Sequence, residues 1–278
     1  SWSEAQKIVL TSFNELSPEI AKIASKFFEN NWIDAEIRNG KDSGAYSHPC
    51  VPDVHPYILM NYNGKSRDVM TLAHELGHGV HQILASKNGY LLADTPLTLA
   101  ETASVFGEML VFQKLLSKAD SKQEKNSMIA EKVEDMLNTV VRQIAFHNFE
   151  TSFHNKRKSN ELTPDEISEI WMETQSQALG DAINLDDSYK PLWSYIPHFV
   201  HTPFYVYAYA FGDCLVNSLW QVRLSGQSSF TESYINLLKS GGKKHHREAL
   251  APFGLDASDP EFWNIGLNTI SSLIDELE

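Results

Sequence analysis

The sequence predicts a mainly α-helical protein with a small β-hairpin or sheet, in one domain or a compact pair of lobes. Apolar residues recur at helical spacing along most of the chain, and 278 residues are enough to bury a large core. Ser17–Glu19 and Thr163–Glu166 have the form of capped helix starts, with proline in the first turn and acidic residues after it. Residues 40–64 depart from the helical pattern.

The segment from about residue 40 to residue 64 is predicted to form short β-strands separated by turns. Its glycines and prolines interrupt any helix, and Tyr57–Met60 is an apolar run followed by Asn63–Gly64, a dipeptide typical of hairpin turns. An exposed strand edge here could hold an extended peptide by main-chain hydrogen bonds. The alternative is a hairpin that only supports the following helix.

The following helix, Val69–Leu84, carries the most informative pattern. Its apolar residues have helical spacing, so much of its surface is expected to be buried. His74 and His78 lie one turn apart on one face, where two neutral imidazoles can bind one zinc ion. Glu75 is turned about 100° away from His74 and can take a proton from a water beside the metal. Two surface histidines are the alternative, but buried histidines need partners, and a metal supplies one.

A catalytic zinc site needs a third protein ligand. Leu84 excludes a histidine six residues after His78, which leaves four candidates downstream: His81, Asp94, Glu101 and Glu108. His81 lies a further turn along and is interpreted as a hydrogen-bonded histidine near the site, and Asp94 as a turn or cap residue. Residues 96–108 read as a second helix with Glu101 and Glu108 on one face. We assign Glu101 to the metal, and Glu108 either to a hydrogen bond with a ligand histidine or to a salt bridge.

The rest of the chain is also predicted to be helical. Residues 121–158 form a long amphipathic pattern, expected to pack against the helix that carries His74. Shorter helices are expected at 229–238 and 261–277. The basic stretch at 243–247 between them is interpreted as a solvated loop.

Composition excludes several classes of partner. The formal net charge of −13 argues against nucleic acid and against anionic membranes. Cys50 and Cys214 are far apart and lack metal-site spacing, as expected for a reducing cytoplasm. The sequence contains no signal-peptide pattern and no apolar run that could span a bilayer.

The motifs together resemble those of the thimet oligopeptidase and oligoendopeptidase F family of zinc metallopeptidases, above all its bacterial oligoendopeptidase F branch. They lie at residues 44–49, 58–64, 74–81, 98–108 and 196–209. The resemblance implies a helical zinc metallopeptidase catalytic domain that encloses a deep channel and hydrolyses short peptides as an endopeptidase. It makes His74, His78 and Glu101 the ligands of one Zn²⁺ ion, and Glu75 the general base.

The resemblance also directs attention to a late loop and helix at about residues 195–224. By position, His198, Tyr205 and Tyr207 best match the side chains that steady the oxyanion in this family, with Tyr209 or His201 as alternatives. A tyrosine hydroxyl is a neutral donor suited to a charge that develops only in the transition state. The same aromatic residues could instead belong to the core, with their hydroxyls satisfied locally.

Members of this family are about twice as long as this chain. Residues 1–278 are therefore expected to be the C-terminal catalytic part of a longer oligopeptidase, with the zinc helices at about 66–115 and the other channel wall formed by an N-terminal part. The expected partners are short peptides, with no nucleic acid or membrane. Two alternatives remain: a zinc carboxypeptidase of related fold, and a non-catalytic structural zinc module, which would need a fourth protein ligand.

Overall fold

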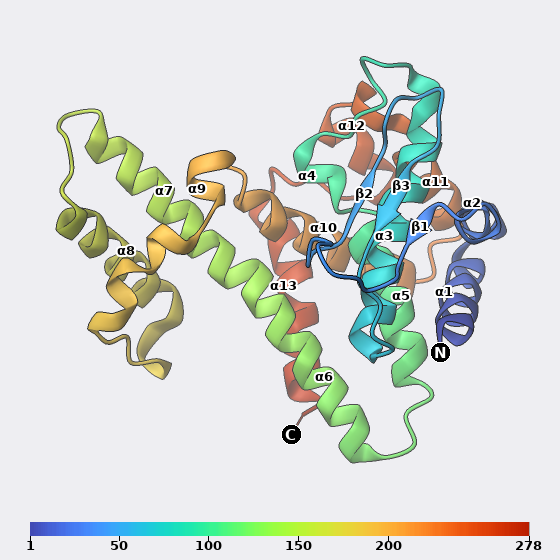
Figure 1. Cartoon of the computed structure of the whole chain (residues 1–278), viewed down its shortest axis with the longest axis horizontal. Helices are drawn as coiled ribbons and strands as arrows, with labels where there is room; N and C mark the ends of the chain where they lie inside the picture. The colour runs from blue at the N-terminus through green and yellow to red at the C-terminus, as the bar shows by residue number, and fades with distance from the viewer. Residues whose placement is uncertain (278) are drawn as a thin grey trace.

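The computed structural model describes residues 1–277 and is mainly helical, with one small sheet (Figure 1). The predicted fold class is confirmed. The helices are α1 Trp2–Leu16, α2 Pro18–Glu29, α3 Ser66–Ala85, α4 Leu97–Ala100, α5 Ser104–Leu116, α6 Lys122–Leu137, α7 Gln143–Arg157, α8 Pro164–Leu179, α9 His198–His201, α10 Tyr207–Leu224, α11 Phe230–Ser240, α12 His246–Leu250 and α13 Pro260–Asp275. The strands are β1 Ile33–Asp34, β2 Tyr46–His48 and β3 Tyr57–Leu59.

The predicted helix caps at Ser17 and Thr163 are present. The Ser17 side chain accepts a hydrogen bond from the backbone of Glu19 at the start of α2. Thr163 and Glu166 form a reciprocal capping box at the start of α8. Because each side chain satisfies a backbone donor that the helix leaves free, these two starts are fixed by local sequence.

The sheet lies beside α3 and has the order β1-β3-β2, with β1 parallel and β2 antiparallel to β3. β2 is held against α3 by a reciprocal pair, in which Ser47 Oγ donates to Gln82 Oε1 at 2.9 Å and Gln82 Nε2 donates to the Ser47 carbonyl at 3.1 Å. One edge of β2 pairs with β3, and β2 is one of the two outer strands of the sheet. The expected small sheet beside the histidine-bearing helix is thus found.

The expected hairpin turn at Asn63–Gly64 is wrong. The loop at residues 49–56 joins β2 to β3, and Asn63 and Gly64 lead from β3 into α3 instead. Asp68 in the first turn of α3 accepts hydrogen bonds from the backbone N–H groups of Asn63 and Lys65. The positive φ of 83° at Gly64 therefore serves a helix entry, where glycine is equally favoured.

Helices α3 and α5 pack closely at the centre of the larger core. A side-chain carbon at Gly77 of α3 would lie 2.4 Å from the Ala103 carbonyl oxygen, just before α5, so only glycine permits this approach. Leu72, Leu76 and Phe106 are fully buried at the contact. The glycine inside the histidine motif thus sets how near the second helix comes to the two histidines.

The helix predicted at residues 96–108 is interrupted. Helix α4 ends at Ala100 and α5 begins at Ser104. Between them, the Thr102 carbonyl accepts a hydrogen bond from the hydroxyl of buried Tyr234 at 3.0 Å. A residue distant in sequence thus donates a hydrogen bond to this turn, and the sequence pattern did not predict that contact.

The segment predicted at 121–158 forms one long, almost continuous helix that crosses the molecule in Figure 1. Helices α6 and α7 are joined by a π-helical turn, Asn138–Arg142. The segment packs mainly against α8, α10 and α13. The expected packing against α3 is replaced by a cavity of about 490 Å³ between α3 and α6.

A second, smaller core lies where α7, α8 and the residues before α10 meet. Its buried members are Phe146, Phe149, Ile170, Trp171 and Val206. In Figure 1 this part stands apart from the α1–α5 body, and both the long α6–α7 helix and α10 lead from it toward that body. Within residues 1–277, no helix combines the length and the apolar character needed to cross a membrane.

Candidate metal centre

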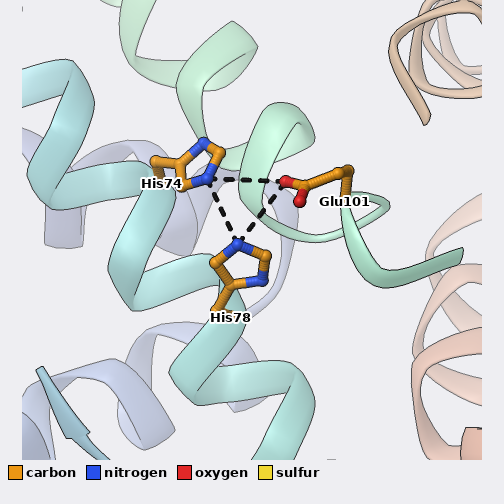
Figure 2. A group of neighbouring side chains, drawn as sticks. All are labelled: His74, His78 and Glu101. Atoms are coloured by element: carbon orange, nitrogen blue, oxygen red, sulfur yellow. Dashed lines mark hydrogen bonds and ion pairs between the residues drawn. The ribbon is translucent and has the colours of Figure 1, made fainter. Parts of the chain in front are cut away.

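Three predicted ligand side chains meet at one point (Figure 2). His74 and His78 project from one face of α3, and Glu101 faces them from the break after α4. The two Nε2 atoms lie 3.2 Å apart, and Glu101 Oε2 lies 3.4 Å from that of His74 and 3.5 Å from that of His78. In a tetrahedral zinc site with bonds of about 2.1 Å, neighbouring donor atoms lie about 3.4 Å apart. The three atoms therefore form one face of a zinc-sized tetrahedron.

The interruption between α4 and α5 positions Glu101. Glu101 is the C-cap residue that follows α4, and Ser104 at the start of α5 donates its hydroxyl to Glu101 Oε2 at 2.7 Å. The helix end fixes the backbone of Glu101, and the hydrogen bond from Ser104 holds its carboxylate facing the two imidazoles. Such support from neighbouring polar groups is typical of metal ligands.

Glu108 occupies the position predicted for a partner of a ligand histidine. Its Oε1 lies 2.5 Å from His74 Nδ1, which leaves Nε2 of the same ring facing His78 and Glu101. Lys132 of α6, whose side chain is only 6% exposed, reaches Glu108 Oε2 at 3.8 Å. The two readings of Glu108 from sequence, histidine partner and salt bridge, both apply.

The charges of the acidic neighbours shape the titration of this cluster. Burial lowers the pKa of His74, but the hydrogen bond and charge of Glu108, with the charges of Glu101 and Glu75, raise it to about 9. Burial and the nearby charge of His74 lower the pKa of His78 to about 4. Without a metal, the cluster thus holds a proton on His74, which a bound cation would displace.

Glu75 is buried beside the cluster, with 5% of its surface exposed. Its Oε2 has no hydrogen-bond partner among the residues that the structure describes. Burial raises the pKa of Glu75 to about 7. The charge of His74 lowers this pKa, and the charges of Glu101 and Glu108 raise it further. A carboxylate that can gain and lose a proton near neutrality is suited to proton transfer.

His81 and Asp94 do not join the three donor atoms. His81 is buried, and its Nε2 lies 3.2 Å from Thr95 Oγ1, which agrees with its interpretation as a hydrogen-bonded histidine. Burial and the charge of His78 lower the pKa of His81 to about 3, so it stays neutral. Both residues line a cavity of about 600 Å³ next to His78.

The late aromatic residues divide into two groups. Tyr205, Tyr209 and His198 lie together: the Tyr209 hydroxyl is 3.3 Å from His198 Nε2, and the two tyrosine rings are 5.2 Å apart. Tyr207 instead packs its ring 5.6 Å from that of His147, and His201 is exposed. Tyr205 and Tyr209 are four residues apart, a helical spacing that could have separated them from Tyr207.

Tyr209 shares a cavity with two of the three candidate ligands. It lines the cavity of about 490 Å³ together with His74 and Glu101. Burial, aided by the charges of Tyr205 and Glu101, raises the pKa of Tyr209 to about 12, so its hydroxyl keeps its proton. Sequence reasoning named Tyr209 only as an alternative and missed Lys132.

Two cavities flank the metal group. The one of about 600 Å³ is lined by His78, His48 of β2 and residues of the 49–56 loop. The one of about 490 Å³ is lined by His74, Glu101 and residues of α6. An extended chain that passes from one cavity to the other would cross the three donor atoms.

Known proteins with similar sequences and structures are peptidases. Over 280 aligned residues the chain is 30% identical to oligopeptidase PepF of Bacillus subtilis, with 100% of this chain and 42% of that protein covered. An oligoendopeptidase F homologue of Borreliella burgdorferi is 29% identical, with 100% and 48% covered. The chain thus spans about half the length of these relatives.

Solved structures give the same result. A candidate peptidase from Chlamydophila abortus has 33% identity and a TM-score of 0.84, with 100% of this chain and 47% of that chain covered. The structure of PZ peptidase A with an inhibitor has a TM-score of 0.81 at 20% identity, covers 98% of this chain and 49% of its own, and supports the fold alone.

The sequence model of peptidase family M3 matches residues 12–269, which include α3, the Glu101 turn and the late aromatic segment. The metal-sized triangle of donor atoms, the buried carboxylate beside it and this match over nearly the whole chain point the same way, and the chain belongs to peptidase family M3.

Proposed function

We propose that this chain is the zinc-binding catalytic part of an endopeptidase that hydrolyses short peptides. The observation that carries the proposal is the triangle of His74, His78 and Glu101 donor atoms, whose sides match a tetrahedral zinc site. Two imidazoles and a carboxylate form a donor set typical of catalytic zinc. Among the described residues the group has three members, which favours an open site over a closed structural one.

Zinc bound there would supply a Lewis acid that activates water and polarises the scissile carbonyl. Glu75 would accept the proton of the attacking water on its unpartnered Oε2 and then deliver it to the leaving nitrogen. Glu108 would hold His74 in the orientation that presents Nε2, with Lys132 balancing the charge of Glu108.

The late aromatic group would stabilise the oxyanion of the tetrahedral intermediate. The raised pKa values of Tyr205 and Tyr209 keep both hydroxyls protonated at neutral pH, so each can donate a hydrogen bond. His198 is within hydrogen-bond distance of Tyr209. Tyr207 was predicted from sequence together with His198 and Tyr205, with Tyr209 as an alternative, and the contact of Tyr207 with His147 gives it the weaker case. We therefore assign the donor role to Tyr205 and Tyr209 ahead of Tyr207.

The arrangement of the cavities favours cleavage within a peptide. Space continues on both sides of the metal group, and the outer strand β2 lies along one side, where an extended substrate can pair with backbone groups. A carboxypeptidase would instead need one side closed around the substrate's terminal carboxylate. We also propose that the protein is cytoplasmic and that a further N-terminal region forms the other wall of the channel.

An internally quenched peptide blocked at both ends tests the proposal. We expect zinc-loaded protein to cut it at an internal bond, chelation to stop cleavage, and added Zn²⁺ to restore it. A carboxypeptidase would cut only the same peptide with a free C-terminus. Stoichiometric zinc without cleavage of either peptide would support a structural metal module, and failure to take up zinc would contradict both.

A further inference from the structure

The smaller core contains a buried acidic side chain with no role so far. Glu150 of α7 is 1% exposed, and within residues 1–277 it makes no ion pair with lysine, arginine or histidine. Its Oε2 has no hydrogen-bond partner among the described residues. Burying a carboxylate without a counter-charge costs more free energy than burying an apolar side chain, so its presence calls for a specific contact.

That contact is with the backbone of the loop before α10. Glu150 Oε1 accepts a hydrogen bond from the N–H of Phe204 at 2.8 Å. Phe204 has a φ of 60°, in the left-handed region that residues with a side chain rarely adopt. The bond therefore compensates for an unfavourable backbone conformation that, without a fixed acceptor, would relax toward negative φ.

The strained residue immediately precedes Tyr205. On the other side of Tyr205, Val206 is fully buried in the smaller core. Tyr205 is thus fixed between two anchors, an apolar one at Val206 and a polar one at Phe204. Its ring lies 5.2 Å from that of Tyr209 and 5.9 Å from that of His198.

We propose that Glu150 is a positioning residue for peptide hydrolysis. Its carboxylate accepts the hydrogen bond from the backbone N–H of Phe204, a contact called the clasp below, and so directs Tyr205 toward the reacting carbonyl. This inference rests on the proposed function. Glu150 itself touches neither the metal group nor the cavities beside it. The contact also gives the buried carboxylate of Glu150 a specific hydrogen-bond partner in the loop before α10.

Amide hydrogen exchange of the zinc-free protein tests the clasp without any activity measurement. In the wild-type chain, the Phe204 amide is expected to exchange slowly, although Phe204 as a residue is 42% exposed. Replacement Glu150→Leu removes the acceptor and retains volume, and should speed exchange of Phe204 and Tyr205 roughly tenfold to hundredfold. Glu150→Gln keeps an acceptor oxygen and should retain most of the protection.

Glu169→Leu is the matched control, because Glu169 is exposed on α8 and should leave the loop unchanged. An unprotected Phe204 amide in the wild type would overturn the clasp. So would a Glu150→Leu variant whose exchange rises equally along α7 and α8, since this would indicate general loosening. These exchange rates test the Glu150–Phe204 hydrogen bond even if the chain proves inactive.

Hydrolysis of the quenched peptide then tests the positioning role. Because the loop would act in the transition state, Glu150→Leu should lower kcat about tenfold or more with little change in KM and the same zinc content, and Glu150→Gln should recover most of kcat. A variant with a loosened loop and wild-type kcat would refute the role of Glu150 in positioning. A wild-type chain that binds zinc and cuts no peptide would instead refute the proposed function.

Discussion

Gly212 of α10 faces the side chain of Glu101 so closely that a methyl group on Gly212 would lie 2.8 Å from Glu101 Cβ. The late helix therefore contacts Glu101, the third candidate ligand, as well as carrying Tyr209. Helix α10 and the Glu101 turn fit together only because one position lacks a side chain.

Gly212→Ala should weaken zinc binding. The added methyl group displaces Glu101 from the two imidazoles, and loss of such support typically costs 10- to 100-fold in metal affinity. Alanine also favours helix, so α10 should remain folded. Competition with a chromophoric chelator measures the affinity, and Gly44→Ala, at a site with open space, is the control. Unchanged affinity would contradict the expected displacement of the Glu101 carboxylate by the methyl group.

Glu75→Gln should retain zinc and lose hydrolysis. The three donor atoms are untouched, whereas the amide cannot accept the water's proton, a role commonly worth about 10²- to 10⁴-fold in rate. Metal content and kcat of the same preparation give the two readouts. Near-normal turnover of the variant would remove Glu75 from the proposed role.

The tyrosines can be separated by removing one hydroxyl at a time. Tyr209→Phe should lower kcat by about 10²-fold or more if its hydroxyl stabilises the oxyanion. Tyr207→Phe is the internal control, because its ring packs against His147, and it should change kcat little. Equal losses in the two variants would contradict the assignment of Tyr209 ahead of Tyr207.

Asp213 should make the free energy of unfolding depend on pH. Burial raises the pKa of Asp213 to about 6, with Glu108 adding to the effect and Lys132 and Asn217 opposing it. A carboxyl whose pKa is higher in the folded state stabilises the fold below its unfolded pKa of 3.8, and this contribution is lost as pH rises through about 6. At pH 7 the loss is about 3 kcal/mol.

Asp213→Asn keeps the hydrogen bond from Asn217 but cannot ionise. The variant should therefore unfold at higher denaturant concentration than the wild type at pH 7 and at a similar concentration near pH 4. Exposed Asp53→Asn should show no such difference. A stability gain for Asp213→Asn that is independent of pH would contradict the buried titration.

Local patterns in the sequence predicted the parts of this site that lie within one or two helical turns. The four-residue spacing of His74 and His78 fixes their common face, and the caps of α2 and α8 are likewise determined by neighbours in sequence. Glu101 was predictable because an acidic residue on an apolar segment requires a positive partner.

Contacts between distant segments were not predictable in the same way. In the break between α4 and α5 the Thr102 carbonyl accepts a hydrogen bond from the hydroxyl of Tyr234, and Glu108 forms an ion pair with Lys132. Both partners come from helices whose own periodicity gives no indication of what they contact. Asn63–Gly64 was misread because the same dipeptide suits a hairpin and a helix entry, and Asp68 decided between them.

The π-helical turn Asn138–Arg142 adds one residue to a helix that would otherwise run straight from α6 into α7. One residue corresponds to about 100° of rotation around a helix axis. Shortening this turn by a single residue would leave both halves helical but would rotate Glu150, and the Phe204 backbone that it contacts, by about 100° relative to α6. The orientation of α7 relative to α6 thus depends on the number of residues in this turn. Point substitutions in the turn should therefore be tolerated far better than a deletion.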